Sequence, residues 1–68
     1  MKIVLNNRSE EIEGFSKLTV QELLDFKKFS FKFLVVKIND AVVRPDEFSS
    51  AIINDGDIVH VLHLISGG

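Results

Sequence analysis

The sequence predicts an α+β fold in which one mixed sheet of four to five strands packs on a single helix. Three observations lead to this prediction. A strand-length apolar run opens the chain at Lys2–Asn6, and a helix start with strong capping chemistry follows at Thr19–Glu22. Beyond the helix, β-branched and aromatic segments alternate with turn-forming residues. A sheet covered on one face by one helix is an economical architecture for 68 residues.

The first two strands are expected to form a β-hairpin. The short run Lys2–Asn6 has an unbroken apolar middle, Ile3-Val4-Leu5, which suits a central strand buried on both faces. Asn6-Asn7-Arg8 provides turn chemistry, because asparagine tolerates a positive φ. Ser9–Gly14 is polar, with Ile12 as its single inward anchor. We therefore expect this second strand at an edge of the sheet, where charges discourage pairing with other chains.

The helix is predicted by local signals. Thr19 and Glu22 have the spacing of a capping box, and Leu18 and Leu23 flank it as a hydrophobic staple. The helix should end near residues 27–29. Its buried side is expected to comprise Val20, Leu23, Leu24 and either Phe26 or the aliphatic stem of Lys27. Four phenylalanines are expected in the core and at the junction of helix and strand: Phe26, Phe29, Phe31 and Phe33.

The second half of the chain is expected to hold three strands and one helical turn. In order, these are strand 31–38, a turn at Asn39-Asp40, strand 41–43, a helical turn in 44–48, a turn at 54–57 and a last strand from Ile58 to Leu64 or Ile65. The order of hairpin, helix and strand is that of a β-grasp, the ubiquitin-like fold. We expect residues 1–65 to form this domain and residues 66–68 to be a flexible tail.

Composition excludes several classes of function. A net charge of −2 without a basic face argues against nucleic acid as a partner. We expect no membrane span and no targeting segment, and the lack of cysteine fits the cytoplasm. His60 and His63 would point to opposite faces of a strand and cannot easily bind one metal ion. With no catalytic arrangement and little room for a cleft, a carrier or binding module is favoured over an enzyme, and no bound metal or cofactor is expected.

The terminal Gly67-Gly68 pair is the feature most suggestive of chemistry. Such a pair ends roughly 0.5% of chains by chance, and the alternative is a frayed end. Glycines can thread a narrow cleft, and a terminal carboxyl, with a reference pKa of about 3.3–3.7, is ionised at neutral pH. The carboxylate of Gly68 could attack the α-phosphorus of ATP, and its unhindered carbonyl could then accept a sulfur nucleophile. We therefore predict covalent modification at Gly68, with Ser66 and Gly67 threading the partner's cleft.

The last strand predicts a docking surface beside this tail. Side chains alternate along a strand, so Val59 and Val61 should face the helix. His60, Leu62 and Leu64 should then lie on the opposite face, and together with Ile65 we expect them to bind a partner. The alternative is that loops partly cover both faces.

Several segments together resemble the ThiS family, the sulfur carrier proteins of thiamine biosynthesis. The resemblance covers the whole chain. It rests on Met1–Asn6, Thr19–Leu24, Val36–Asn39, Val43–Phe48, Asp55–Asp57 and the terminal Gly67-Gly68.

The resemblance implies a mechanism and a set of partners. An E1-like, ATP-dependent adenylating enzyme would convert the Gly68 carboxylate to an acyl-adenylate. Sulfur from cysteine, supplied through a sulfurtransferase or cysteine desulfurase, would give a thiocarboxylate that thiazole synthase uses to build the thiazole ring. The carrier itself would catalyse nothing and would be monomeric when free.

Three alternatives share the expected fold. The small subunit of molybdopterin synthase uses the same tail chemistry to make the molybdenum cofactor, although it is typically somewhat longer. A ubiquitin-like modifier would instead form isopeptide bonds with lysines. An inert β-grasp interaction domain would use neither chemistry.

Overall fold

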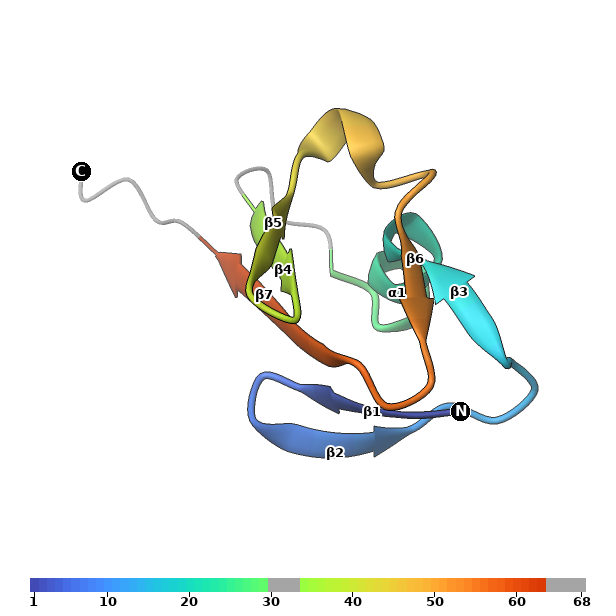
Figure 1. The fold of residues 1–68 in the computed structure, drawn as a ribbon. Coiled ribbons are helices and arrows are strands. Elements are labelled where there is room, and N and C mark those ends of the chain that lie inside the picture. The colour runs from blue at the N-terminus through green and yellow to red at the C-terminus, as the bar shows by residue number, and fades with distance from the viewer. Residues whose placement is uncertain (30–33, 64–68) are drawn as a thin grey trace.

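The structure, a computed structural model, describes residues 1–29 and 34–63 (Figure 1). Five strands form the main sheet in the order β2-β1-β7-β4-β5, and two short strands, β3 and β6, form a second sheet. The predicted α+β fold with one mixed sheet and one helix is confirmed. The elements are β1 (Lys2–Leu5), β2 (Arg8–Glu11), β3 (Lys17–Thr19), α1 (Val20–Phe26), β4 (Leu34–Ile38), β5 (Ala41–Val43), the 3₁₀ turn η1 (Pro45–Glu47), β6 (Ile52–Asn54) and β7 (Ile58–His63).

Two tight turns set the registers of the sheet's hairpins. Asn6 and Asn7 have φ values of 50° and 67°, and Asn39 and Asp40 have 49° and 71°. Positive φ at both central residues defines a type I′ turn, which matches the twist of the strands that it joins. Leu5 therefore lies opposite Arg8, and Ile38 opposite Ala41. The expected turns at 6–7 and 39–40 are both confirmed.

The first hairpin differs from the prediction in two respects. Ile3 and Leu5 are buried, whereas Lys2 is exposed and Val4 half-buried, so β1 is covered on one face only. The prediction of burial on both faces was wrong because the helix covers a single face of this sheet. β2 lies at the sheet edge as expected, but it ends at Glu11. Ile12, just beyond it, is fully buried and is the inward anchor.

Helix α1 begins with the predicted capping box. The Thr19 hydroxyl accepts a 3.0 Å hydrogen bond from the Glu22 N–H, and the Glu22 carboxylate accepts one of 2.8 Å from the Thr19 N–H. At the other end Lys28 has a φ of 58°, and the N–H of Phe29 donates to the Leu24 carbonyl at 2.8 Å. This is a Schellman closure, which satisfies carbonyls that the last helical turn leaves free.

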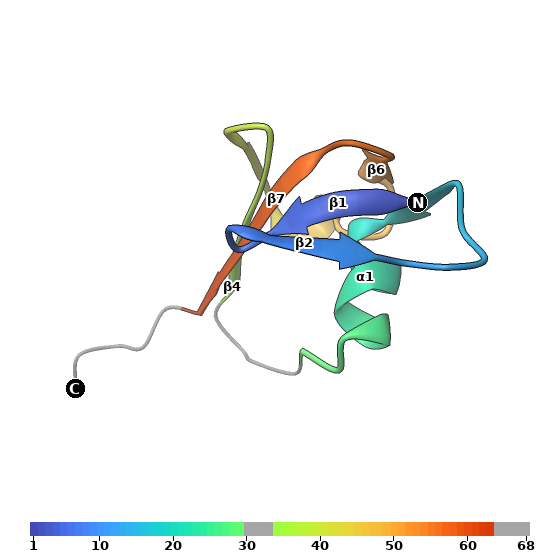
Figure 2. The ribbon, with the colours of Figure 1, turned by 90° about the horizontal axis from the view of Figure 1, so that it is seen from below.

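The helix packs on one face of the main sheet (Figure 2). Phe26 is 52% exposed, so its expected place in the core was wrong. Lys27, the alternative, continues the helical spacing of Val20, Leu23 and Leu24 and is the half-buried one. Phe29 packs against the core, whereas Phe31 and Phe33 lie outside the described residues. The buried core comprises Ile3, Leu5, Ile12, Leu18, Val20, Leu23, Leu24, Val36, Val43, Phe48, Ile53, Val59 and Val61.

The small second sheet was not predicted. Leu18 of β3 lies opposite Ile53 of β6, and both are buried. The N–H of Val20 donates to the Ala51 carbonyl at 3.0 Å, and that of Gln21 to the Phe48 carbonyl at 2.8 Å. These bonds attach the start of the helix to the segment that leads into β7.

Candidate functional site

Strand β7 is the middle strand of the main sheet and leads toward residues 64–68. It pairs in parallel with β1 and antiparallel with β4, where the pairs run from Ile38–Val59 to Leu34–His63. Figure 1 shows β7 crossing the sheet toward the C-terminal end of the chain. A strand held on both sides is a rigid base for whatever follows it.

Polar side chains fix the beginning of β7. Asn39 Oδ1 accepts a 2.9 Å hydrogen bond from the N–H of Ile58, while its Nδ2 donates to Asp57 Oδ1 at 3.0 Å. The other Asp57 oxygen accepts a 2.8 Å bond from the N–H of Asn54. The turn before β7 and the turn between β4 and β5 are therefore joined through Asn39 and Asp57. The expected turn at 54–57 is confirmed, and Gly56 has a φ of 88° there.

The alternation expected along β7 is present. Val59 is fully buried and Val61 is 8% exposed, both on the helix side. Leu62 is 46% exposed on the opposite face, and His60 is half-buried. His60 and Leu62, two of the expected partner-binding residues, therefore share a face of the sheet. Leu64 and Ile65, together with the tail residues Ser66, Gly67 and Gly68, lie outside the described residues.

Neighbouring strands add residues to this face that the sequence reasoning missed. Directly opposite residues in paired strands point to the same side of a sheet. Val4 lies opposite Ile58, Val35 opposite Leu62, and Lys37 opposite His60 on one side and Val42 on the other. The alternation of β4 could have placed Val35 and Lys37, since Val36 between them is buried. We call the resulting surface the open face: Val4, Val35, Lys37, Val42, Ile58, His60 and Leu62.

The open face is largely apolar and well exposed. Val42 is 60% exposed and Ile58 is 47% exposed. Within residues 1–29 and 34–63, no secondary-structure element covers this side of the main sheet (Figures 1 and 2). Exposed apolar residues that gather on one face indicate a contact surface for another molecule.

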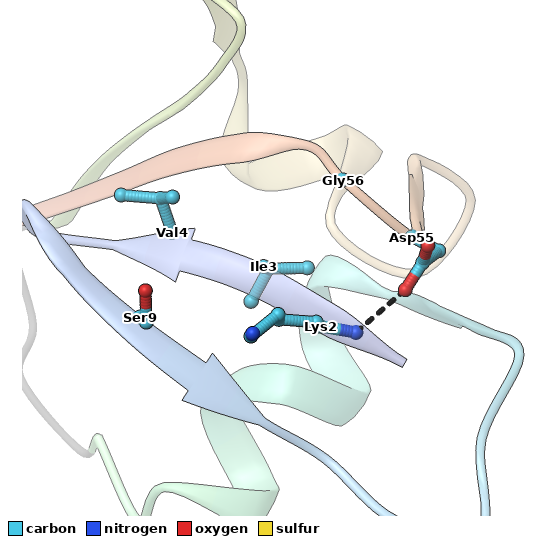
Figure 3. Close-up of a pocket in the computed structure, with 6 residues that line it drawn as sticks. All are labelled: Lys2, Ile3, Val4, Ser9, Asp55 and Gly56. Carbon is cyan, nitrogen blue, oxygen red and sulfur yellow. Dashed lines mark hydrogen bonds between the residues drawn. The ribbon is translucent and has the colours of Figure 1, made fainter.

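A shallow cavity of about 230 Å³ lies between the first hairpin and the turn at Asp55-Gly56 (Figure 3). The backbone N–H of Lys2 donates to Asp55 Oδ1 at 2.6 Å, and the N–H of Gly56 donates to the Lys2 carbonyl at 2.7 Å. The Asp55 carboxylate thus holds the turn at 54–57 against the start of β1. Among the described residues there is no group of three His, Cys, Asp or Glu side chains placed to hold a metal ion.

In the described part of the chain, no helix has the length and apolarity needed to cross a membrane.

Comparison with known proteins identifies a matching family and similar solved structures. The model of the ThiS family matches residues 3–68. The crystal structure of a thiamine biosynthesis protein (ThiS) from Geobacter metallireducens superposes with a TM-score of 0.90 at 29% identity, covering 100% of both chains. A solution NMR structure of a thiamine biosynthesis protein from the same organism gives 0.81 at 29% identity, covering 100% of this chain and 88% of that one. The family resemblance inferred from the sequence is confirmed.

Proposed function

Because the chain belongs to the ThiS family, we propose that it is a sulfur carrier of thiamine biosynthesis that acts through the carboxylate of Gly68. The observation that carries the proposal is the family match, which extends through residue 68 and so includes the Gly67-Gly68 pair. The two similar structures, both described as thiamine biosynthesis proteins, support the choice of this pathway over molybdenum cofactor synthesis.

The proposed chemistry takes place on partner enzymes. A carboxylate oxygen of Gly68 attacks the α-phosphorus of ATP on an E1-like adenylating enzyme, and pyrophosphate leaves. A persulfide sulfur, derived from cysteine by a desulfurase or sulfurtransferase, attacks the carbonyl carbon, and AMP leaves. A thiol then attacks the enzyme-side sulfur of this acyl disulfide, so that the thiocarboxylate on Gly68 is the leaving group and the thiol forms a disulfide with the enzyme's cysteine. Thiazole synthase takes up this sulfur, and the carrier contributes no catalytic residue.

The fold suits a protein that presents its own end to other enzymes. β7 leads directly to residues 64–68 and is paired on both sides. The open face lies on the same strand, with Leu62 close to the point where the tail begins. We propose that the adenylating enzyme binds the open face, with contacts extending to Leu64 and Ile65, and takes Ser66, Gly67 and Gly68 into its cleft.

Intact-mass spectrometry tests this proposal. The protein is incubated with the adenylating and sulfur-transfer enzymes of thiamine synthesis from its own source, together with ATP and cysteine. The expected product has one oxygen replaced by sulfur, and fragmentation should place the change at Gly68.

A variant lacking Gly68 serves as the matched control, because it retains residues 1–67 and should remain unmodified. If the intact protein keeps its mass with these enzymes, the sulfur-carrier proposal is wrong and an inert interaction domain is favoured. An isopeptide bond to a lysine would instead identify a modifier.

A further inference from the structure

The open face has a polar centre formed by the ammonium group of Lys37 and the imidazole of His60. Lys37 of β4 lies directly opposite His60 of β7, and such pairs have Cβ atoms about 4.5–5.5 Å apart. Both side chains are half-buried. Within residues 1–29 and 34–63 neither makes a side-chain hydrogen bond or an ion pair.

The other residues of the open face are apolar. Val42 flanks Lys37 on β5, and the next pair along the strands is Val35 with Leu62. Ile58 lies on the other side of His60 along β7. The open face itself contains no carboxylate, and no hydrogen bond or ion pair within the described part of the chain joins one to Lys37 or His60.

A partner that covers this face must compensate the loss of hydration of the Lys37 ammonium group. Removing a charge from water is unfavourable unless an opposite charge or several hydrogen bonds replace the lost hydration. A purely apolar partner surface would leave the Lys37 charge unpaired. A carboxylate surrounded by apolar residues would complement both the centre and its rim.

We infer that the enzyme that docks on the open face places an acidic side chain against Lys37 and His60. This inference rests on the proposed function, since it takes the adenylating enzyme as the occupant. It assigns Lys37 a role in selecting that partner, and no role in the chemistry at Gly68. A second copy of the chain fits poorly, because a two-fold contact centred on this face would bring two Lys37 ammonium groups together.

The test compares Lys37→Met with wild type in binding to the adenylating enzyme by calorimetry. Methionine preserves an unbranched apolar side chain but leaves the partner's carboxylate without a counter-charge. The Kd should rise about 30-fold or more, and Lys37→Arg should restore most of the affinity. The salt dependence of binding should be weaker for Lys37→Met than for wild type. In the adenylation assay, KM should rise while kcat at saturating carrier stays unchanged.

Lys17→Met is the matched control, because Lys17 is an exposed lysine on β3 in the other sheet. Its Kd should equal that of wild type, and thermal melting should show all three variants folded. Equal or tighter binding by Lys37→Met overturns the inference, as does an equal loss in Lys17→Met. The inference is also overturned if sedimentation shows that the wild type is a dimer and that Leu62→Asp dissociates this dimer. In each of these cases, sulfur transfer to the wild type would still support the proposed function. A wild type that neither binds the adenylating enzyme nor accepts sulfur would overturn the proposed function and the inference together.

Discussion

Asn6 Oδ1 accepts a 2.8 Å hydrogen bond from the backbone N–H of Val61, so that a turn side chain completes the pairing of the central strand. β1 ends at Leu5, and the N–H of Asn6 still donates to the Val59 carbonyl at 2.9 Å. The chain then turns away into β2. Without the Asn6 amide, the N–H of Val61 would have no acceptor on the β1 side of β7. Asn6 therefore stabilises the part of β7 nearest the proposed docking surface.

Asn6→Gly should lower the free energy of unfolding by about 1–3 kcal/mol, because the N–H of Val61 loses its acceptor in a buried position. Glycine is the informative replacement, since Asn6 has a φ of 50° that alanine adopts only with strain. Urea denaturation with a constant m-value measures the change.

Asn7→Gly is the control for this variant. Asn7 has a φ of 67°, is exposed, and makes no side-chain hydrogen bond to the rest of the described chain. Its stability should stay within about 0.5 kcal/mol of wild type. Equal losses in the two variants would mean that turn flexibility, and not the bond to Val61, determines the effect.

The capping box gives a second prediction. Thr19→Ala should lower the free energy of unfolding by about 1 kcal/mol, because the N–H of Glu22 loses its 3.0 Å acceptor at the start of the helix. Thr19→Ser keeps the hydroxyl and should behave nearly as wild type. Thermal unfolding followed by circular dichroism compares the two. A serine variant as unstable as the alanine variant would show that the threonine methyl group matters more than the cap.

The elements that the sequence predicted are those encoded by neighbouring residues. The capping box needs only Thr19 and Glu22, and both type I′ turns need only a pair of residues that tolerate positive φ. The alternation of Val59, His60 and Val61 placed one face of β7 toward the helix without any knowledge of its partners. In each case the physical cause lies within a few residues.

The features that the sequence left unpredicted depend on contacts between distant segments. β3 and β6 have three residues each, too few for a periodic signal, and their pairing joins Leu18 to Ile53. Burial of β1 on one face only follows from the position of the helix. Alternation along β4 could have placed Lys37 on the open face, but its position directly opposite His60 follows only from the register of β4 against β7. The Schellman closure at Lys28 could not be predicted from the sequence, because glycine usually occupies the position with positive φ.

Lys28→Gly should raise stability by about 0.5–1 kcal/mol, because Lys28 has a φ of 58°, a conformation that a Cβ atom disfavours. Gly56→Ala is the reverse test. An added Cβ there would meet no atom within 4 Å, so its φ of +88° isolates the backbone strain, which should lower stability by about 1–2 kcal/mol. Denaturant midpoints of the two variants should move in opposite directions. A shift of both in the same direction would contradict this account.

Leu62 and Val61 are adjacent on β7 and should respond oppositely to the same substitution. Leu62 is 46% exposed, so Leu62→Asp should leave a cooperative unfolding transition. Val61 is 8% exposed among core side chains, so Val61→Asp buries a charge without a partner and should abolish folding. Calorimetric scans distinguish the two. The folded Leu62→Asp variant should then bind the adenylating enzyme more weakly, because a carboxylate replaces an apolar contact on the open face. An unfolded Leu62→Asp variant would place Leu62 in the core, and unchanged binding by a folded one would exclude this residue from the docking surface.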